Sequence, residues 1–211
     1  MMRVSIIGTG YVGLVTGVCF AEKGHQVHCV DIDPAKIDQI YQGISPIYEL
    51  GLDKLLQRHI GDRLKATTDL RRAVLETDVS MIAVGTPFDG REIDLTYIKQ
   101  AAHQIGEALK EKSTYHLVVV KSTVVPGTTD RIVLPILETA SGKKAGDDFG
   151  VGMNPEFLTE GEAVRDFMFP DRIVLGGIDE KSIDLLEQLY TGFEGVERIR
   201  TSNTTAETIK Y

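Results

Sequence analysis

Gly8-Thr9-Gly10-Tyr11-Val12-Gly13 is the stretch that decides the fold of this chain. The β-branched run Arg3–Ile7 precedes it, an apolar helical pattern over Val12–Lys23 follows it, and a second strand pattern, Gln26–Val30, comes next. Strand, glycine turn, helix and strand in this order are typical of a βαβ unit whose glycine turn faces a dinucleotide. The sequence therefore predicts a Rossmann-type βαβ unit at the start of the chain.

The residues of this stretch have separate physical roles in such a turn. Gly8 permits the tight turn, Gly10 leaves room for the backbone to approach a pyrophosphate, and Gly13 lets the helix pack close to the strand. Tyr11 and Val12 begin the helix, where free N–H groups and the positive end of the helix dipole favour phosphate. We expect these five residues to bind a dinucleotide.

Asp31 follows the second strand pattern, roughly 20 residues after the glycine turn. A carboxylate at this position accepts hydrogen bonds from ribose hydroxyls and repels the 2′-phosphate of NADP, so the predicted cofactor is NAD. Lys36, in the next predicted helix, weakens this preference slightly because it could reach the ribose or a phosphate. Two alternatives stay open: a nucleotide-free α/β protein with a glycine-rich turn, and a Rossmann methyltransferase that uses S-adenosylmethionine.

The rest of the chain alternates short apolar runs with longer helical patterns. This alternation predicts an α/β fold of the Rossmann-type, doubly wound class, with a mainly parallel sheet and helices on both faces. The predicted strands lie at Arg3–Ile7, Gln26–Val30, Val79–Val84, His116–Lys121, Gly150–Met153 and Arg172–Leu175. The predicted helices lie at Val12–Lys23, Pro34–Gln42, Leu52–Arg58, Leu95–Lys110 and Glu180–Tyr190. The polar stretch Ser141–Asp148 is predicted to be a loop inside the domain.

Composition and charge exclude several classes of protein. Of the 211 residues, 42% are hydrophobic and 26% are charged, as in proteins that bury a core. The formal net charge of -8 gives no reason to expect nucleic acid or an anionic membrane as a partner. Cys19 and Cys29 show neither metal-site nor disulfide-framework spacing. They are interpreted as buried, reduced thiols of a cytoplasmic protein, and no metal is expected.

Two further predicted strands run into loops of small and hydroxyl-bearing residues. Gly85-Thr86-Pro87 follows one of them, and a loop that begins at Ser122 and Thr123 follows the other. Ligands of open α/β sheets bind at the carboxyl ends of strands. The nicotinamide end of the cofactor is therefore expected beside these loops, with Thr86 and Thr123 as candidate contacts. Helix capping by the same residues is the alternative interpretation.

A further motif, Asn154-Pro155-Glu156-Phe157-Leu158-Thr159-Glu160-Gly161, makes the pattern specific. Together with Gly8–Gly13, Val84–Pro87 and Lys121–Gly127, it resembles the UDP-glucose/GDP-mannose dehydrogenase family, in the right order and along essentially the whole chain. The resemblance implies an NAD-dependent enzyme that oxidises the C6 alcohol of a nucleotide sugar to a carboxylate with two NAD molecules.

Two segments bear on which nucleotide sugar is the substrate. Asp166–Val174 looks more like UDP-glucose dehydrogenases, whereas the insert around Ser141–Gly152 looks more like the GDP-mannose branch. We expect UDP-glucose, oxidised to UDP-glucuronate for polysaccharide biosynthesis, with GDP-mannose as the alternative.

The resemblance also implies roles for individual residues. Glu156 matches the proposed general base of a hydrolytic step, Thr123 a residue that helps to hold a catalytic water, and Lys210 a lysine that stabilises oxyanion character on the substrate. The implied NAD contacts are Tyr11, Val12, Asp31, Lys36, Thr86, Thr123 and Glu160. The implied substrate contacts are Glu156, Phe157, Leu158, Thr159, Glu160 and Lys210.

Spacing along the chain adds an argument for Glu156 as a base and adds none for Lys210. Glu156 and Glu160 are four positions apart, so in a helical turn they would share a face. Their repulsion would then raise the pKa of at least one carboxyl group, which suits a base. A solvated acidic helix face is the alternative. Lys210 taken alone would be a surface charge, and its candidacy depends on the match over Ala206–Tyr211.

The chemistry that the resemblance implies also needs a cysteine nucleophile, supplied by a second, UDP-binding domain. Neither Cys19 nor Cys29 matches it, because one falls in the first helix pattern and the other in the second strand pattern. The chain alone is therefore expected to bind NAD without turning over a nucleotide sugar. A non-catalytic NAD-binding sensor module and a related dehydrogenase acting on 3-hydroxy acids are the other hypotheses.

The end of the chain resembles a helix that has just begun. Ser202 or Asn203 is a plausible cap, and the helical pattern is unfinished at Tyr211. We expect residues 1–200 to form the NAD-binding domain and residues 201–211 to begin the connecting helix of a longer protein. The resemblance implies that the full-length protein is a homodimer formed through that helix.

Overall fold

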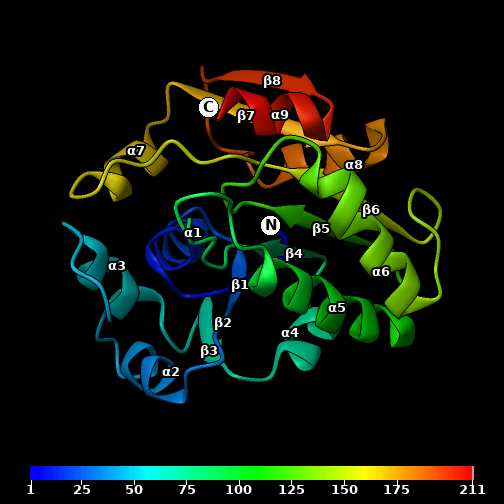
Figure 1. The fold of residues 1–211 in the computed structure, drawn as a ribbon. Coiled ribbons are helices and arrows are strands. Elements are labelled where there is room, and N and C mark those ends of the chain that lie inside the picture. The colour runs from blue at the N-terminus through cyan, green and yellow to red at the C-terminus, as the bar shows by residue number, and fades with distance from the viewer. Residues whose placement is uncertain (211) are drawn as a thin grey trace.

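A computed structural model describes residues 1–210 of the chain. Within these residues the strands form a single sheet in the order β3-β2-β1-β4-β5-β6-β7-β8 (Figure 1). The strands are β1 (Arg3–Ile7), β2 (Gln26–Val30), β3 (Leu64–Thr67), β4 (Val79–Ile82), β5 (His116–Val120), β6 (Phe149–Met153), β7 (Arg172–Gly177) and β8 (Glu197–Thr201). The chain moves outward from β1 to β3 and returns to β4 on the other side of β1, which is the strand order of a Rossmann fold.

The parallel strands of this sheet end level with one another. Ile7 of β1 pairs with Val30 of β2 on one side and with Ile82 of β4 on the other. Val120 of β5 pairs with Ile82 on one side and with Met153 of β6 on the other. The loops that leave these strands therefore open at one edge of the sheet, and the switch point lies between β1 and β4.

The last two strands run in the opposite direction. β7 is antiparallel to β6, with Gly176 opposite Met153, and β8 pairs parallel with β7. Thr201, the last residue of β8, pairs with Gly176 and is thus level with Met153. The reversal therefore delivers the end of the chain to the same edge as the loops of the parallel strands. A mainly parallel sheet, as predicted, is confirmed.

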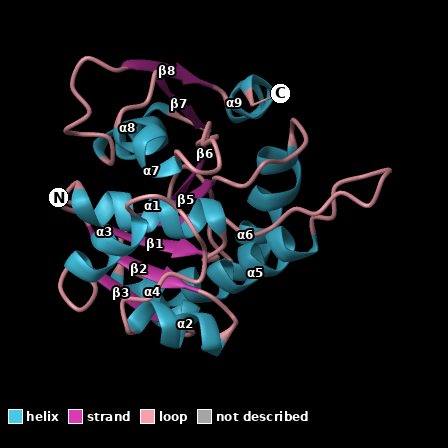
Figure 2. Cartoon of the chain, turned by 90° about the vertical axis from the view of Figure 1, so that its left-hand side faces the viewer, coloured by secondary structure: helices cyan, strands magenta, loops and turns pink. Residues whose placement is uncertain are grey.

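Helices cover both faces of the sheet. They are α1 (Tyr11–Glu22), α2 (Pro34–Tyr41), α3 (Leu52–His59), α4 (Leu70–Glu76), α5 (Thr96–Glu111), the π-helical turn η1 (Thr129–Val133), α6 (Leu134–Ser141), α7 (Ala163–Met168), α8 (Glu180–Gln188) and α9 (Asn203–Ile209). One buried apolar cluster joins the sheet to α1, α3, α7 and α8, and a second joins it to α4, α5, α6 and α9. Figure 2 shows α1 and α3 lying over β1 and β2. The predicted doubly wound Rossmann-type fold is confirmed.

Several short elements escape prediction from the sequence. β3, α4 and α7 contain only four, seven and six residues, too few for a hydrophobic period to be recognised. β8 is a polar edge strand with the sequence ERIRT and only partly buried side chains. The predicted ends of β4, β5 and α8 lie within two residues of the observed ends.

The helix expected near the end of the chain is present as α9. Ser202 caps it, because its hydroxyl oxygen accepts a hydrogen bond from the N–H of Thr205 at 3.2 Å. Ala206 packs into the same apolar cluster as α5, so the boundary between residues 200 and 201 stays a prediction. Tyr211 lies outside the described residues. Over residues 1–210, no helix combines the length and apolar character needed to cross a membrane.

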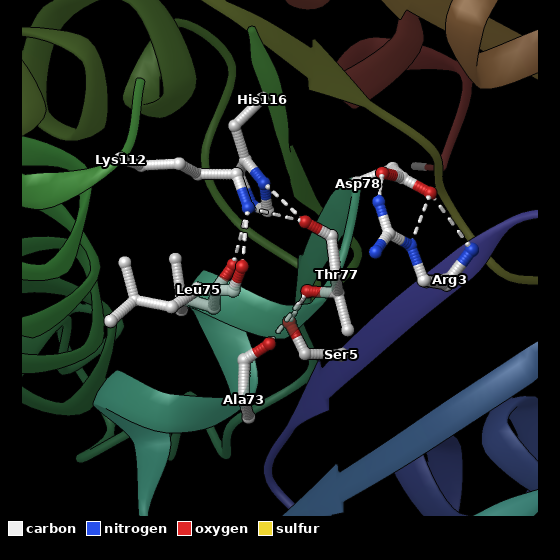
Figure 3. A network of polar contacts seen from close by, with 9 residues as sticks. Arg3, Ser5, Ala73, Leu75, Thr77, Asp78, Lys112 and His116 are labelled. Carbon is white, nitrogen blue, oxygen red and sulfur yellow. Dashed lines mark hydrogen bonds and ion pairs between the residues drawn. The ribbon is translucent and has the colours of Figure 1, made fainter. Parts of the chain in front are cut away.

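A buried polar network lies at the opposite edge of the sheet, where β4 and β5 begin (Figure 3). His116 has no exposed surface, and its Nδ1 lies 3.2 Å from the carbonyl oxygen of Thr77. Because a carbonyl oxygen only accepts, Nδ1 carries the proton, and Nε2 accepts from the Ser80 hydroxyl at 2.8 Å. The Lys112 ammonium donates to the carbonyl oxygens of Val74, Leu75 and Thr77 at the end of α4. These bonds tie α5 and β5 to α4.

Candidate active site

The glycine turn after β1 has the geometry that a dinucleotide requires. Gly8 has a φ of +102°, and a Cβ there would lie 2.7 Å from the carbonyl oxygen of Ala83. A Cβ at Gly13 would lie 1.9 Å from the carbonyl oxygen of Gly8. A Cβ at Gly10 would meet no described atom within 4 Å. Two glycines are thus required by the protein itself, whereas the third keeps a space open at the surface, as approach of a pyrophosphate requires.

Helix α1 leaves its first turn available to an anion. In the described part of the chain no side chain caps the helix at Gly10, and its first turn holds no acidic residue. The N–H groups of Tyr11 and Val12 therefore lie at an uncapped positive helix end. Both residues are half-buried, and uncapped N–H groups at a helix start favour a phosphate.

Asp31 is held rigidly at the end of β2. Its Oδ2 accepts from the N–H and the hydroxyl of Thr9 at 2.8 and 2.7 Å, and its Oδ1 accepts from the N–H of Asp33 at 3.1 Å. Burial alone would raise the pKa of Asp31, but these hydrogen bonds outweigh it and the pKa is lowered. Lys36 on α2 lies near enough to favour the charged carboxylate further. An ionised, oriented carboxylate beside the glycine turn suits ribose hydroxyls and opposes a 2′-phosphate.

The loops after β4 and β5 are bonded to each other. The Thr86 hydroxyl donates to the carbonyl oxygen of Thr123 at 2.8 Å, and the Ser122 hydroxyl donates to that of Val84 at 2.7 Å. Thr86 and Thr123 line one cavity of about 600 Å³ together with Phe88. The structure thus brings the two threonines to a shared cavity at the predicted edge, and neither caps a helix.

The segment after β6 is not helical. From Asn154 to Thr159 the backbone is an irregular loop, and Gly161 closes it with a φ of +92°. Glu156 is half-buried and Glu160 is exposed, so the prediction that they share a helix face is wrong. A local side-chain contact takes the place of a helical backbone bond here, since Oε2 of Glu156 accepts from the N–H of Leu158 at 2.7 Å. The argument for a base from carboxylate repulsion therefore does not apply.

Lys210 and Glu156 form an ion pair instead. Lys210 Nζ lies 2.6 Å from Glu156 Oε1 and 2.7 Å from the Glu156 carbonyl oxygen. Phe157 lies beside the pair, with its ring centroid 5.7 Å from Nζ. Glu207, one turn earlier on α9, accepts from the N–H groups of Gly127 and Thr129. Helix α9 is thus fixed to the segment that follows Thr123, while Lys210 at its C-terminal end binds Glu156 in the loop after β6.

Three buried polar residues that share a cavity with Glu156 were not predicted from the sequence as site residues. Lys121 Nζ donates to Asn154 Oδ1 at 2.8 Å, and the Tyr190 hydroxyl donates to the same oxygen at 2.5 Å. All three line a cavity of about 410 Å³ with Glu156 and Leu158. Desolvation lowers the pKa of Lys121 to about 8, against the opposing pull of Glu156. Asn154 and Lys121 stand in the quoted motifs and could have been singled out, whereas Tyr190 carries no signal in the sequence.

The two cysteines are structural, as predicted. Cys19 and Cys29 have no exposed surface. Burial raises the pKa of each thiol to about 12. Both thiols are therefore protonated and shielded, unlike an activated nucleophile.

Comparison with known proteins identifies the family. The sequence model of the family described as "UDP-glucose/GDP-mannose dehydrogenase family, NAD binding domain" matches residues 2–194. The chain belongs to this family. As an NAD binding domain of the UDP-glucose/GDP-mannose dehydrogenase family, it has NAD as its cofactor. The alternatives of a methyltransferase and of a nucleotide-free protein are thereby set aside.

Named relatives of this family differ in their substrates. GDP-mannose 6-dehydrogenase of Pseudomonas aeruginosa is 51% identical over 100% of the chain and 48% of its own length. UDP-glucose 6-dehydrogenase of Haloferax volcanii is 46% identical over 100% of the chain and 50% of its own length. A crystal structure of a ternary complex of GDP-mannose dehydrogenase from Pseudomonas aeruginosa superposes with a TM-score of 0.95 at 50% identity, covering 100% of this chain and 48% of that one. The chain spans about half the length of these relatives.

Proposed function

We propose that this chain is the NAD-binding half of a nucleotide-sugar 6-dehydrogenase. Of the two candidate sugar substrates, we propose GDP-mannose ahead of UDP-glucose. The observation that carries the proposal is the Lys210–Glu156 ion pair, with 2.6 Å between Nζ and Oε1, at the same sheet edge as the glycine turn and Asp31. A carboxylate and an ammonium paired beside a dinucleotide site provide both a proton acceptor and a cation for a reacting oxygen.

The residues of this chain have distinct tasks in that reaction. NAD, when bound, supplies the acceptor for hydride from the carbon that is oxidised. Asp31 orients the ribose hydroxyls, and the backbone of Tyr11 and Val12 binds the pyrophosphate. Lys210 donates a hydrogen bond to the substrate oxygen that gains negative charge. Glu156 takes a proton from water in the hydrolytic step, and Thr123 holds that water.

The family resemblance supports the remaining contacts of this proposal. Thr86 and Lys36 contact NAD from the two sides of the switch point. Glu160 lies in the loop that faces the nicotinamide end. Phe157, Leu158 and Thr159 line the site of the sugar.

GDP-mannose is placed first because the relative that bears its name has 51% identity, against 46% for the UDP-glucose enzyme. UDP-glucose remains the second candidate, since Asp166–Val174 resembles the UDP-glucose branch. A direct comparison of the two substrates decides between them.

The experiment uses the full-length product of the gene that encodes this chain. Purified protein is mixed with NAD and with GDP-mannose or UDP-glucose. The amount of NADH formed is measured by its absorbance. We expect two NADH per molecule of GDP-mannose and slower or no reaction with UDP-glucose. The 211-residue chain alone is expected to bind NAD and to produce no NADH steadily. Full-length protein that binds NAD but oxidises neither sugar would support the sensor module instead.

Asp31→Asn is expected to reduce the preference for NAD over NADP about tenfold or more. The substitution removes the charge that opposes a 2′-phosphate while keeping the shape of the side chain. Isothermal titration of the 211-residue chain with NAD and NADP measures both dissociation constants. Asp38→Asn, at an exposed position of α2, is the matched control and should leave both unchanged. Equal discrimination in the Asp31 variant would show that this carboxylate does not select the cofactor.

A further inference from the structure

Glu49 is a buried carboxylate in the loop between α2 and α3. It is 4% exposed, although the residues on either side, Tyr48 and Leu50, are 89% and 72% exposed. Its backbone thus runs along the surface while its side chain points inward. Buried carboxylates are rare unless donors satisfy them, so the groups around Glu49 define its role.

Three donors from two other parts of the chain meet this carboxylate. The Tyr11 hydroxyl donates to Oε2. The N–H of Gly161 lies 2.9 Å from Oε2, and the N–H of Ala163 lies 3.1 Å from Oε1. Glu49 therefore connects the first residue of α1 to the start of α7.

Tyr11 completes the connection from its own side. Its hydroxyl oxygen accepts from the N–H of Gly161 at 3.0 Å. Burial and the bond to Glu49 raise the pKa of Tyr11 to about 12, so the hydroxyl keeps its proton at neutral pH and remains a donor. The backbone N–H of the same residue lies in the first turn of α1, where the pyrophosphate of NAD is expected.

Gly161 gives the loop after β6 its contact with Glu49. Its φ of +92° lets the chain turn between Glu160 and α7 and points its N–H at Glu49. Between Glu156 and Glu160 the segment lacks the backbone ladder of a helix or strand. Side-chain contacts therefore hold it. Lys210 binds Glu156 at one end, Asp166 accepts from the N–H of Thr159 at 2.8 Å, and Glu49 accepts from the N–H of Gly161 at the other end.

We infer that Glu49 is a positioning residue that couples the dinucleotide turn to the loop of residues 159–163, and through it to Glu160. This inference rests on the proposed function, because it assumes that NAD binds at Tyr11 and that Glu160 faces the nicotinamide. NAD bound at the turn holds Tyr11, Tyr11 and Glu49 hold Gly161, and the loop in turn completes the cofactor site. Such coupling is reciprocal, so a disordered loop weakens NAD binding.

The test compares four forms of the 211-residue chain: unaltered, Tyr11→Phe, Glu49→Gln and the double variant. Isothermal titration gives the NAD dissociation constant, and hydrogen exchange gives the protection of the amides of residues 159–163 with and without NAD. We expect each single variant to bind NAD three- to tenfold more weakly. The double variant should be no weaker than the weaker single variant, since both remove one connection. NAD should protect the loop amides in the unaltered chain and not in the variants.

Matched controls separate coupling from a general loss of stability. Tyr48→Phe alters an exposed tyrosine in the same loop, and Glu107→Gln alters an exposed glutamate on α5. Both should bind NAD as the unaltered chain does. If Glu49→Gln folds poorly by circular dichroism, Tyr11→Phe carries the test, because it removes one hydroxyl and leaves the carboxylate its two N–H donors.

Two results would overturn the inference. If the unaltered chain binds no NAD, the proposed function fails and the coupling fails with it. If NAD binds with affinity unchanged in Tyr11→Phe and Glu49→Gln, or protects the loop equally in all forms, the coupling alone fails. A role limited to folding would lower the melting temperature of the variants without altering the protection that NAD produces.

Discussion

Gly13→Ala is expected to destabilise the chain by at least about 3 kcal/mol, at the upper end of overpacking effects. The new Cβ would lie 1.9 Å from the carbonyl oxygen of Gly8 and 3.0 Å from its carbonyl carbon. Neither atom belongs to a flexible side chain, so relief requires α1 to move away from the turn that follows β1. Because α1 carries the N–H groups for the pyrophosphate, NAD binding should be lost with the packing. Chemical unfolding monitored by circular dichroism measures the change.

Gly10→Ala is the matched comparison for Gly13→Ala, because its Cβ would meet no described atom within 4 Å. This variant should fold with nearly unchanged stability and bind NAD at least about tenfold more weakly, since the methyl group enters the space for the pyrophosphate. The same substitution thus separates a glycine required by the fold from one required by the ligand. Equal stability of the two variants would contradict the packing argument.

The buried imidazole of His116 is expected to make the chain sensitive to mild acid. Desolvation, with help from the Lys112 ammonium, lowers the pKa of His116 to about 3, against the opposing effects of Thr77 and Asp78. The unfolded chain has a histidine pKa of about 6.5, so it binds the proton first. Stability from neutral His116 is therefore complete above about pH 6.5 and is lost as the pH falls towards 3. The loss is on the order of 4 kcal/mol over that range.

A comparison of variants isolates this contribution from that of the carboxylates. The free energy of unfolding is measured by urea titration between pH 7.5 and 4.5 in the unaltered chain, His116→Gln and His103→Gln. His116→Gln should be less stable at pH 7.5 but lose less stability on acidification. His103 is exposed on α5, and its replacement should leave the pH dependence unchanged. Nuclear magnetic resonance of the unaltered chain gives a second measure, since a His116 that titrates near pH 6.5 would refute the prediction.

The sequence predicted the parts of the site that depend on neighbours along the chain. The Gly8–Gly13 turn, its flanking strand and helix, Asp31 at the end of β2, and the hydroxyl loops at Thr86 and Thr123 are local patterns. Each follows from steric limits or from a period within a few residues. The helix start at Ser202 belongs to the same group, because a cap acts on N–H groups two or three positions away.

Predictions that depended on tertiary surroundings were less successful. The spacing of Glu156 and Glu160 suggested a shared helix face, but the segment is an irregular loop. Lys121 and Tyr190 become site residues only because β5, β6 and the end of α8 converge on Asn154. Glu49 gave no signal at all, since an acidic residue in a polar loop is ordinarily exposed.

The glycine turn, the βαβ order and the preference for NAD were therefore determined by the sequence itself, because they arise from backbone sterics and charge within short stretches. The pairing of Lys210 with Glu156 across 54 positions, and of Gly161 with Glu49 across 112, was decided only by the tertiary structure. The strand order and the reversed β7 bring those segments to one edge of the sheet. Contacts of that kind depend on where strands lie in the sheet, which no local pattern of residues specifies.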